Sequence, residues 1–138
     1  MQYLHPPGQC RNCYTATTER LIDYPIFRLG YTLCESCQTL LGQKLMRVTD
    51  ETILLYFALR DRHVPAELEK MDGNRKIDIA VARSRVHIEI DSKTGEVTEE
   101  SSSSNFLTLH IPTAQVRNNL AETTYYIEAF LKESSSRI

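Results

Sequence analysis

Apolar residues recur along the chain with two different spacings. Between residues 39 and 65 they recur every three or four positions, which is the period of an α-helix with one buried face. This pattern predicts one helix over residues 39–47 and a second that begins after Thr49. Threonine is favoured at helix N-caps, and acidic residues follow it in the first turn, where the helix dipole favours negative charge. Pro65 is expected to end the second helix.

Further along, residues 75–81 and 85–91 alternate between apolar and polar side chains, which is the period of a half-buried β-strand. The linker of three residues between them is short enough for a hairpin. A tip at Arg83 and Ser84 would place Asp78 opposite Glu89, and Lys76 opposite Asp91. The apolar positions that face the core are Ile77, Ile79, Val81, Val86, Ile88 and Ile90.

The neighbouring segments complete a small α/β, or α+β, core over residues 49–133. Residues 66–70 favour a helix by propensity and a hairpin arm by position. Residues 92–105 contain a four-serine run and are expected to form a loop. A strand over 106–112 leads into a last helix capped by Thr113, and residues 134–138 are expected to fray. The core-facing positions of that helix are Val116, Leu120, Thr123, Ile127 and Leu131.

Four cysteines dominate the first part of the chain. They form two C-x2-C pairs, Cys10 with Cys13 and Cys34 with Cys37. Two such pairs can complete a tetrahedral sulfur shell, so we expect a structural Zn2+ in a module over residues 1–48. The residues between the pairs, 17–33, are expected to form short strands. Two disulfides or a redox C-x2-C pair are the alternatives, and the absence of glycine after each pair weakens a ribbon-type assignment.

Composition limits the class of protein. The chain has 138 residues, of which 41% are hydrophobic and 25% charged, so it is expected to be globular. Its net charge of −2 argues against binding nucleic acid through bulk positive charge. With no secretory signal pattern and no apolar run of membrane length, we expect a cytoplasmic protein without a membrane partner. Five glycines leave no glycine-rich cofactor cradle.

Acidic residues on the two alternating strands suggest a second metal. Asp78 and Glu89 would be opposite each other, and like charges in such positions are unfavourable unless a cation joins them. Mg2+ would suit both carboxylates, with Asp91 pointing the same way two residues later. The alternative is an ordinary solvated outer face, on which alternating charges are common.

The segments 76–81, 86–91, 106–112 and 116–120 resemble the restriction-endonuclease-like, or PD-(D/E)xK, superfamily. The nearest branch is that of the very-short-patch-repair endonucleases, and the resemblance covers roughly residues 50–132. It implies that Asp78 is the first metal ligand, Glu89 the second and Asp91 the third acid of a catalytic Mg2+ site. Asp91, Ser92 and Lys93 also match a D-x-K ending, with Lys93 as an alternative catalytic lysine.

The chain departs from that family between its third and last strands. Ser92 replaces a glycine, residues 92–105 contain no histidine and are barely long enough for a crossover helix, and His110 stands where relatives tend to carry arginine. Two functions therefore remain. One is a metal-dependent nuclease that cleaves nucleic-acid phosphodiesters and uses its zinc module to help bind the nucleic acid. The other is a non-catalytic zinc-containing adaptor that binds nucleic acid or protein. A protein partner or a homodimer fits either function.

Overall fold

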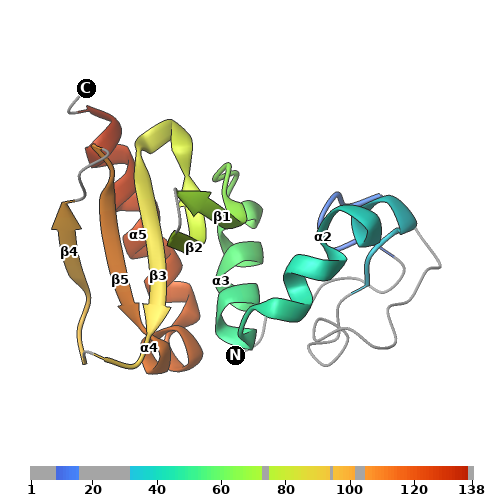
Figure 1. Ribbon diagram of the computed structural model, residues 1–138, viewed down its shortest axis with the longest axis horizontal. Helices are drawn as coiled ribbons and strands as arrows, with labels where there is room; N and C mark the ends of the chain where they lie inside the picture. The colour runs from blue at the N-terminus through green and yellow to red at the C-terminus, as the bar shows by residue number, and fades with distance from the viewer. Residues whose placement is uncertain (1–8, 16–31, 73–74, 94, 102–104, 137–138) are drawn as a thin grey trace. The chain divides into compact units, whose positions relative to one another are not determined.

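The computed structural model describes residues 9–15, 32–72, 75–93, 95–101 and 105–136 (Figure 1). The strands expected over 17–33 lie almost entirely outside these residues. Contacts between Cα atoms divide the chain into two compact units, Met1–Ile53 and Leu54–Ile138. The division falls five residues after the boundary expected at residue 48.

The first unit contains helix α2, Glu35–Arg47. It begins four residues earlier than the apolar period predicts, because the second cysteine pair forms its start. Cys34 is the extended N-cap residue, and its carbonyl accepts the Gln38 N–H at 2.9 Å. Cys37 is buried in the first turn, so the helix positions two of the four thiols.

Helix α3, Asp50–Asp61, follows after a two-residue break. The predicted cap is confirmed, because the Thr49 hydroxyl accepts the N–H of Thr52 at 3.2 Å. The helix ends before Pro65. Its C-terminus is closed by His63, which has a left-handed backbone with φ of 64° and donates its N–H to the Arg60 carbonyl. A backbone turn at His63, rather than the missing N–H of the proline, therefore ends α3.

The second unit contains a five-stranded sheet with strand order β1-β2-β3-β5-β4. Its strands are β1 Glu67–Asp72, β2 Arg75–Val81, β3 Val86–Asp91, β4 Thr98–Ser101 and β5 Leu107–Pro112. Neighbouring strands are antiparallel except β3 and β5, which run parallel (Figure 1). The segment before residue 72 is therefore the hairpin arm. β4 corrects the expectation of a loop over residues 92–105.

The hairpin register is the one expected from the sequence. Ile79 pairs with Ile88 and Val81 with Val86, and the 3-10 turn η1, Ala82–Ser84, joins the strands. In-register side chains on neighbouring strands point to the same face of a sheet. One face of the sheet is therefore lined with apolar residues, all of them less than 2% exposed: Ile77, Ile79, Val81, Val86, Ile88, Leu109 and Ile111.

The last helix predicted from the sequence is two helices, α4 Thr113–Asn118 and α5 Leu120–Ser136. Asn119 interrupts them with a φ of −138° and ψ of 50°. Thr113 is the first residue of α4, and the extended Pro112 is its N-cap residue without a side-chain cap bond, which corrects the predicted cap. Helix α5 continues to Ser136, so residues 134–136, which were expected to fray, are helical.

Helix α5 lies along the sheet and contributes to the same core (Figure 1). Of the positions predicted to face the core, Val116, Thr123, Ile127 and Leu131 are buried and Leu120 is half-buried. Arg62 beyond α3 forms an ion pair with Glu128 of α5 at 2.7 Å. The fold is thus mixed α+β. Among the described residues, every helix is too short or too polar to cross a membrane.

Candidate metal centres

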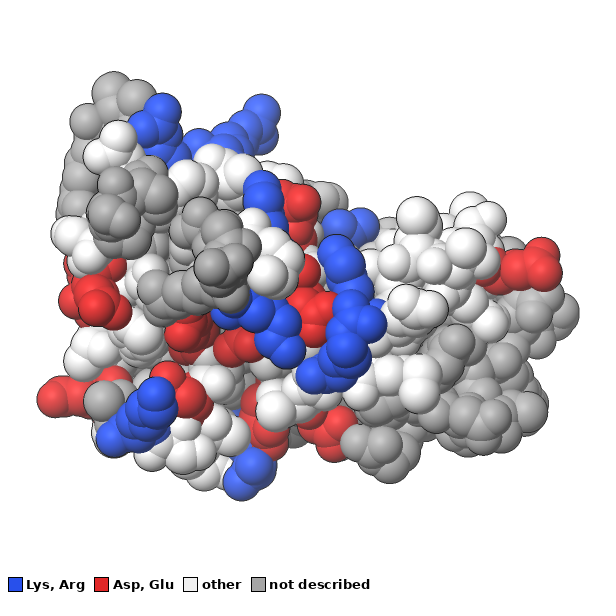
Figure 2. Space-filling view, viewed as in Figure 1, with Lys and Arg blue, Asp and Glu red and all other residues white. Residues whose placement is uncertain are grey.

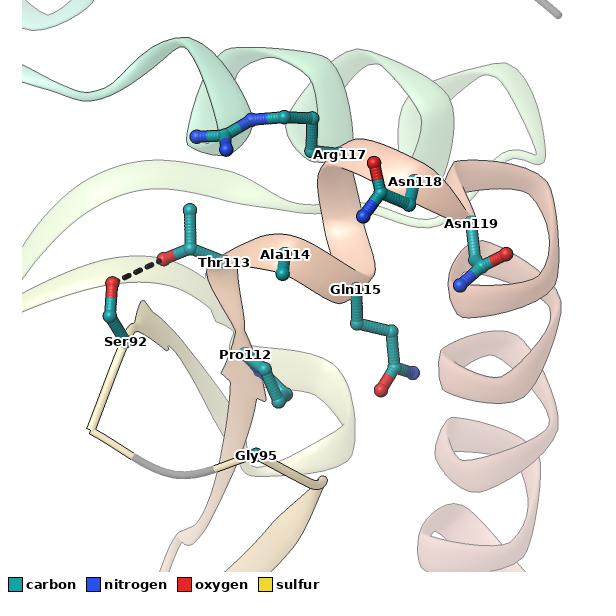
Figure 3. Close-up of a pocket in the computed structure, with 9 residues that line it drawn as sticks. All are labelled: Ser92, Gly95, Pro112, Thr113, Ala114, Gln115, Arg117, Asn118 and Asn119. Carbon is teal, nitrogen blue, oxygen red and sulfur yellow. Dashed lines mark hydrogen bonds between the residues drawn. The ribbon is translucent and has the colours of Figure 1, made fainter.

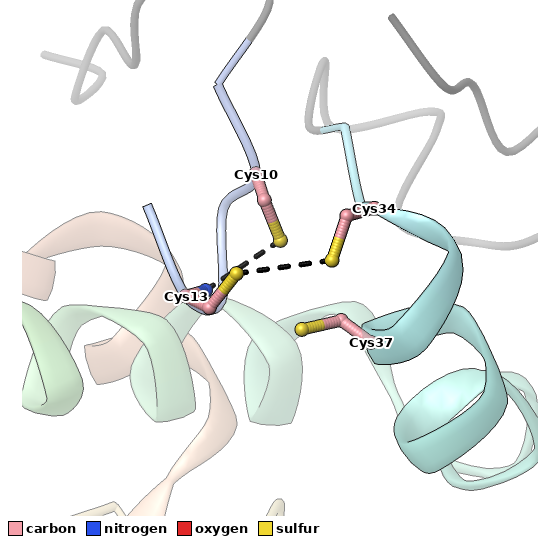
Figure 4. Close-up of side chains that lie close together, drawn as sticks. All are labelled: Cys10, Cys13, Cys34 and Cys37. Carbon is pink, nitrogen blue, oxygen red and sulfur yellow. Dashed lines mark hydrogen bonds between the residues drawn. The ribbon is translucent and has the colours of Figure 1, made fainter. Parts of the chain in front are cut away.

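The four cysteines of the first unit converge on one point (Figure 4). Their Sγ atoms lie within 4.8 Å of one another, and those of Cys13 and Cys34 are 3.7 Å apart. A disulfide bond would hold two sulfurs about 2.05 Å apart, and all four thiols are free. The arrangement therefore places four separate sulfur ligands around one centre, which could hold a metal ion.

Hydrogen bonds and burial act on the cysteine sulfurs in opposite directions. The Asn12 side-chain amide lies 3.3 Å from the Cys37 sulfur, and the Cys13 N–H lies 3.5 Å from that of Cys10. A hydrogen bond with the Thr15 hydroxyl at 2.7 Å lowers the pKa of Cys13 to about 6, whereas burial raises the pKa of Cys37 to about 12. At neutral pH, Cys37 would lose its proton only in exchange for a cation.

Carboxylates and a histidine meet on the polar face of the sheet in the second unit. Glu89 of β3 is in register with His110 of the parallel strand β5, so their side chains point to the same face. Asp91 follows two residues after Glu89 on that face. The ligand atoms of Glu89, Asp91 and His110 all lie within 4.8 Å of one another, which makes this a second group that could hold a metal ion.

Asp78 stands beside this group rather than within it. Beyond the last described pair of the β2–β3 ladder, its Oδ2 accepts the N–H of Ile90 at 2.9 Å. Burial raises the pKa of Asp78, and the negative charges of Glu89 and Asp91 raise it further, whereas the Ile90 N–H and Lys76 lower it. The charges of the three predicted acids are therefore close enough to interact.

The sequence did not identify two residues that lie at this group, His110 and Glu100. His110 was noted only as a departure from a family pattern, and Glu100 lies in a segment that was expected to be a loop. The His110 Nε2 atom is 2.8 Å from a Glu100 carboxylate oxygen, and its Nδ1 atom is 3.8 Å from an Asp91 carboxylate oxygen. Had a parallel pairing of residues 86–91 with 107–112 been assumed in this register, it would have predicted that His110 lies beside Glu89.

Lys93 follows the acids on an exposed segment. Its backbone N–H donates to the Asp91 Oδ1 atom at 3.1 Å, which holds one oxygen of that carboxylate. The catalytic role that the D-x-K match implies for its side chain remains a prediction.

A polar pocket of about 440 Å³ lies where β3 and β5 end (Figure 3). Ser92, directly after Asp91, and Thr113, at the start of α4, line it and approach each other to 3.5 Å between hydroxyl oxygens. Pro112 is in register with Asp91, so the pocket adjoins the carboxylate group along both strands. The remaining lining residues are mostly polar: Gly95, Ala114, Gln115, Arg117, Asn118 and Asn119.

The surface charge is mixed in sign. On the face shown in Figure 2, Lys and Arg side chains are interspersed with Asp and Glu. Both signs of charge are present on the described part of that face, which agrees with the net charge of −2. Contact with a phosphate backbone would therefore depend on local groups.

Comparison of the chain with protein-family models, with curated proteins and with solved structures yields no match.

Proposed function

We propose that this protein hydrolyses phosphodiester bonds in nucleic acid with the help of a divalent cation held by the carboxylates of β3. The observation that carries the proposal is the convergence of Glu89, Asp91 and His110 beside the half-buried carboxylate of Asp78. A solvated outer face would give alternating charges. It would not require a half-buried aspartate whose pKa is raised next to two other acids.

The donor set fits a hard or borderline cation. Carboxylate oxygens are the preferred ligands of Mg2+ and Mn2+. When bound, such a cation neutralises charge on a phosphoryl group and lowers the pKa of a coordinated water. The Oδ2 atom of Asp78 accepts the Ile90 N–H, and its Oδ1 atom is a second acceptor. Through Oδ1, Asp78 can orient a water molecule or accept its proton beside Glu89, Asp91 and His110.

The pocket beside the cluster offers a place for the substrate. Its volume is within the range of small-molecule sites, and a nucleotide is of that size. Gln115, Asn118 and Asn119 each supply both a donor and an acceptor, which suits base edges and sugar hydroxyls. The described lining also includes one basic residue, Arg117.

The experiment is a cleavage assay with plasmid DNA, single-stranded DNA and RNA, in Mg2+ or Mn2+. We expect cleavage that depends on the cation and falls at least 100-fold in Asp78→Asn and in Glu89→Gln. Glu99→Gln is the matched control, because Glu99 is exposed on the edge strand β4 outside the cluster. Binding without cleavage by the unaltered protein would contradict the proposal and support the non-catalytic adaptor.

We also propose that the four-cysteine cluster holds a structural Zn2+. A tetrahedral shell with Zn–S bonds of about 2.3 Å has sulfur–sulfur edges of about 3.8 Å, and the Cys13 and Cys34 sulfurs are 3.7 Å apart. All four ligands are thiolates, so no coordination position is open for substrate. The cluster thus fits a structural site better than a catalytic one.

A further inference from the structure

We propose that Glu89, Asp91 and His110 form a site that prefers a first-row transition-metal dication, such as Mn2+, to Mg2+. This inference rests on the proposed function only in taking the same cluster as the cation site. It adds a nitrogen ligand that the acidic residues alone do not provide. It also assigns a role to strand β4, which the sequence pattern does not predict.

The nitrogen ligand is Nδ1 of His110. It lies 3.8 Å from the Asp91 Oδ2 atom, which is too long for a hydrogen bond. Two ligand atoms that share one cation at about 2.1 Å each are separated by at most about 4.2 Å. The observed separation therefore fits two ligands of one ion. Glu89, in register with His110 on the neighbouring strand, supplies the third ligand from the same face.

Glu100 of β4 fixes the orientation of the imidazole. Its carboxylate is 2.8 Å from Nε2 of His110, and Thr98 on the same strand is in register with His110. A carboxylate at Nε2 favours the tautomer with its proton on that atom, which leaves the lone pair of Nδ1 directed away from Glu100. Metal-binding histidines commonly have such a carboxylate partner, and its loss weakens metal affinity about 10- to 100-fold.

The donor set determines the class of metal. Mg2+ prefers oxygen ligands in octahedral geometry and retains several waters, so an imidazole adds little to its binding. Imidazole binds transition-metal dications well, and mixed carboxylate and imidazole ligands favour them over Mg2+. The four cysteines form a separate and softer sulfur site, so the two sites differ in the ions that they select.

The test is titration of the full chain, with its cysteine cluster loaded with Zn2+, by Mn2+ alone. Free Mn2+ is measured by electron paramagnetic resonance, and Mg2+ affinity by competition. We expect one Mn2+ per chain, bound at least 10-fold more tightly than Mg2+. His110→Ala and His110→Gln should weaken Mn2+ binding about 10-fold or more and change Mg2+ binding less than twofold. Glu100→Gln should weaken Mn2+ binding, and the exposed neighbour change Glu99→Gln should not.

Equal losses of Mn2+ and Mg2+ affinity in both His110 variants, or no loss in either, would overturn the inference. An equal effect of Glu99→Gln and Glu100→Gln would remove the role of Glu100. The assay contains no nucleic acid, so its outcome is separate from cleavage. Selective Mn2+ binding without cleavage refutes only the proposed function. If the protein cleaves nucleic acid but the ratio of its Mn2+ and Mg2+ affinities is unchanged in the His110 variants, only this inference is refuted.

Discussion

At the scale of single residues, Asp78 is where function and stability oppose each other most clearly. Its carboxylate is half-buried near Glu89 and Asp91, and burial is the main cause of its raised pKa. The charged form is therefore less favourable in the folded protein than in the unfolded chain. Proteins keep such groups at sites where activity requires them, at a cost in stability.

We expect Asp78→Asn to stabilise the fold at neutral pH. A raised folded-state pKa means that the folded chain holds the proton more tightly than the unfolded chain. Stability contributed by the protonated form is therefore lost as the pH rises from the ordinary value of 3.8 through the higher folded-state value. Asparagine removes the charge, and its side-chain oxygen can still accept the Ile90 N–H.

Thermal unfolding from pH 3 to 8, without added divalent cations, measures this effect. The melting temperature of Asp78→Asn should exceed that of the unaltered chain by a few degrees at pH 7, and the difference should disappear below about pH 4. If Asp78→Asn is less stable than the unaltered chain at pH 7, the charged carboxylate stabilises the folded state, which would contradict the prediction.

At the scale of elements, alternation predicts the central hairpin and its register because Ile77, Ile79 and Ile88 must be buried together. The same pattern does not reveal β4, whose four residues are all exposed and polar. The apolar period also continues across Asn119, so the break between α4 and α5 leaves no signal. Glu89 and Asp91 could therefore be named as candidate ligands from the sequence, whereas the positions of His110 and Glu100 depend on strand pairings that only the folded sheet defines.

The start of α3 gives a prediction at this scale. Thr49→Ala removes the side-chain acceptor for the Thr52 N–H and should lower the free energy of unfolding by about 1 kcal/mol. Thr49→Ser retains the hydroxyl and should lie close to the unaltered chain. Urea denaturation followed by circular dichroism measures both, and equal losses in the two variants would contradict a capping role.

At the scale of the whole molecule, the chain consists of two compact units with different sources of stability. The second unit has a continuous apolar core that includes Ile79, Ile88 and Leu109. In the first unit, four thiols converge, and one of them, that of Cys37, is buried in the first turn of α2. A small unit of this kind gains much of its folding free energy from a bound metal.

Metal content and hydrogen exchange test this division. We expect one Zn2+ per chain in protein purified under reducing conditions, and its loss in Cys34→Ser. A strong zinc chelator should raise hydrogen exchange in residues 32–47 and leave residues 76–91 protected. Zinc affinity should fall as the pH is lowered, because the thiols must lose protons to bind. Zinc-free protein with unchanged protection of residues 32–47 would contradict a structural metal.

A cation held by Glu89, Asp91 and His110 is the basis of both proposals for the second unit, and anomalous diffraction from crystals soaked in Mn2+ tests for it directly. We predict one anomalous peak on the polar face of the sheet, about 2.1 Å from carboxylate oxygens of Glu89 and Asp91 and from His110 Nδ1. Crystals that show no peak between these three side chains would contradict a cation site at this group.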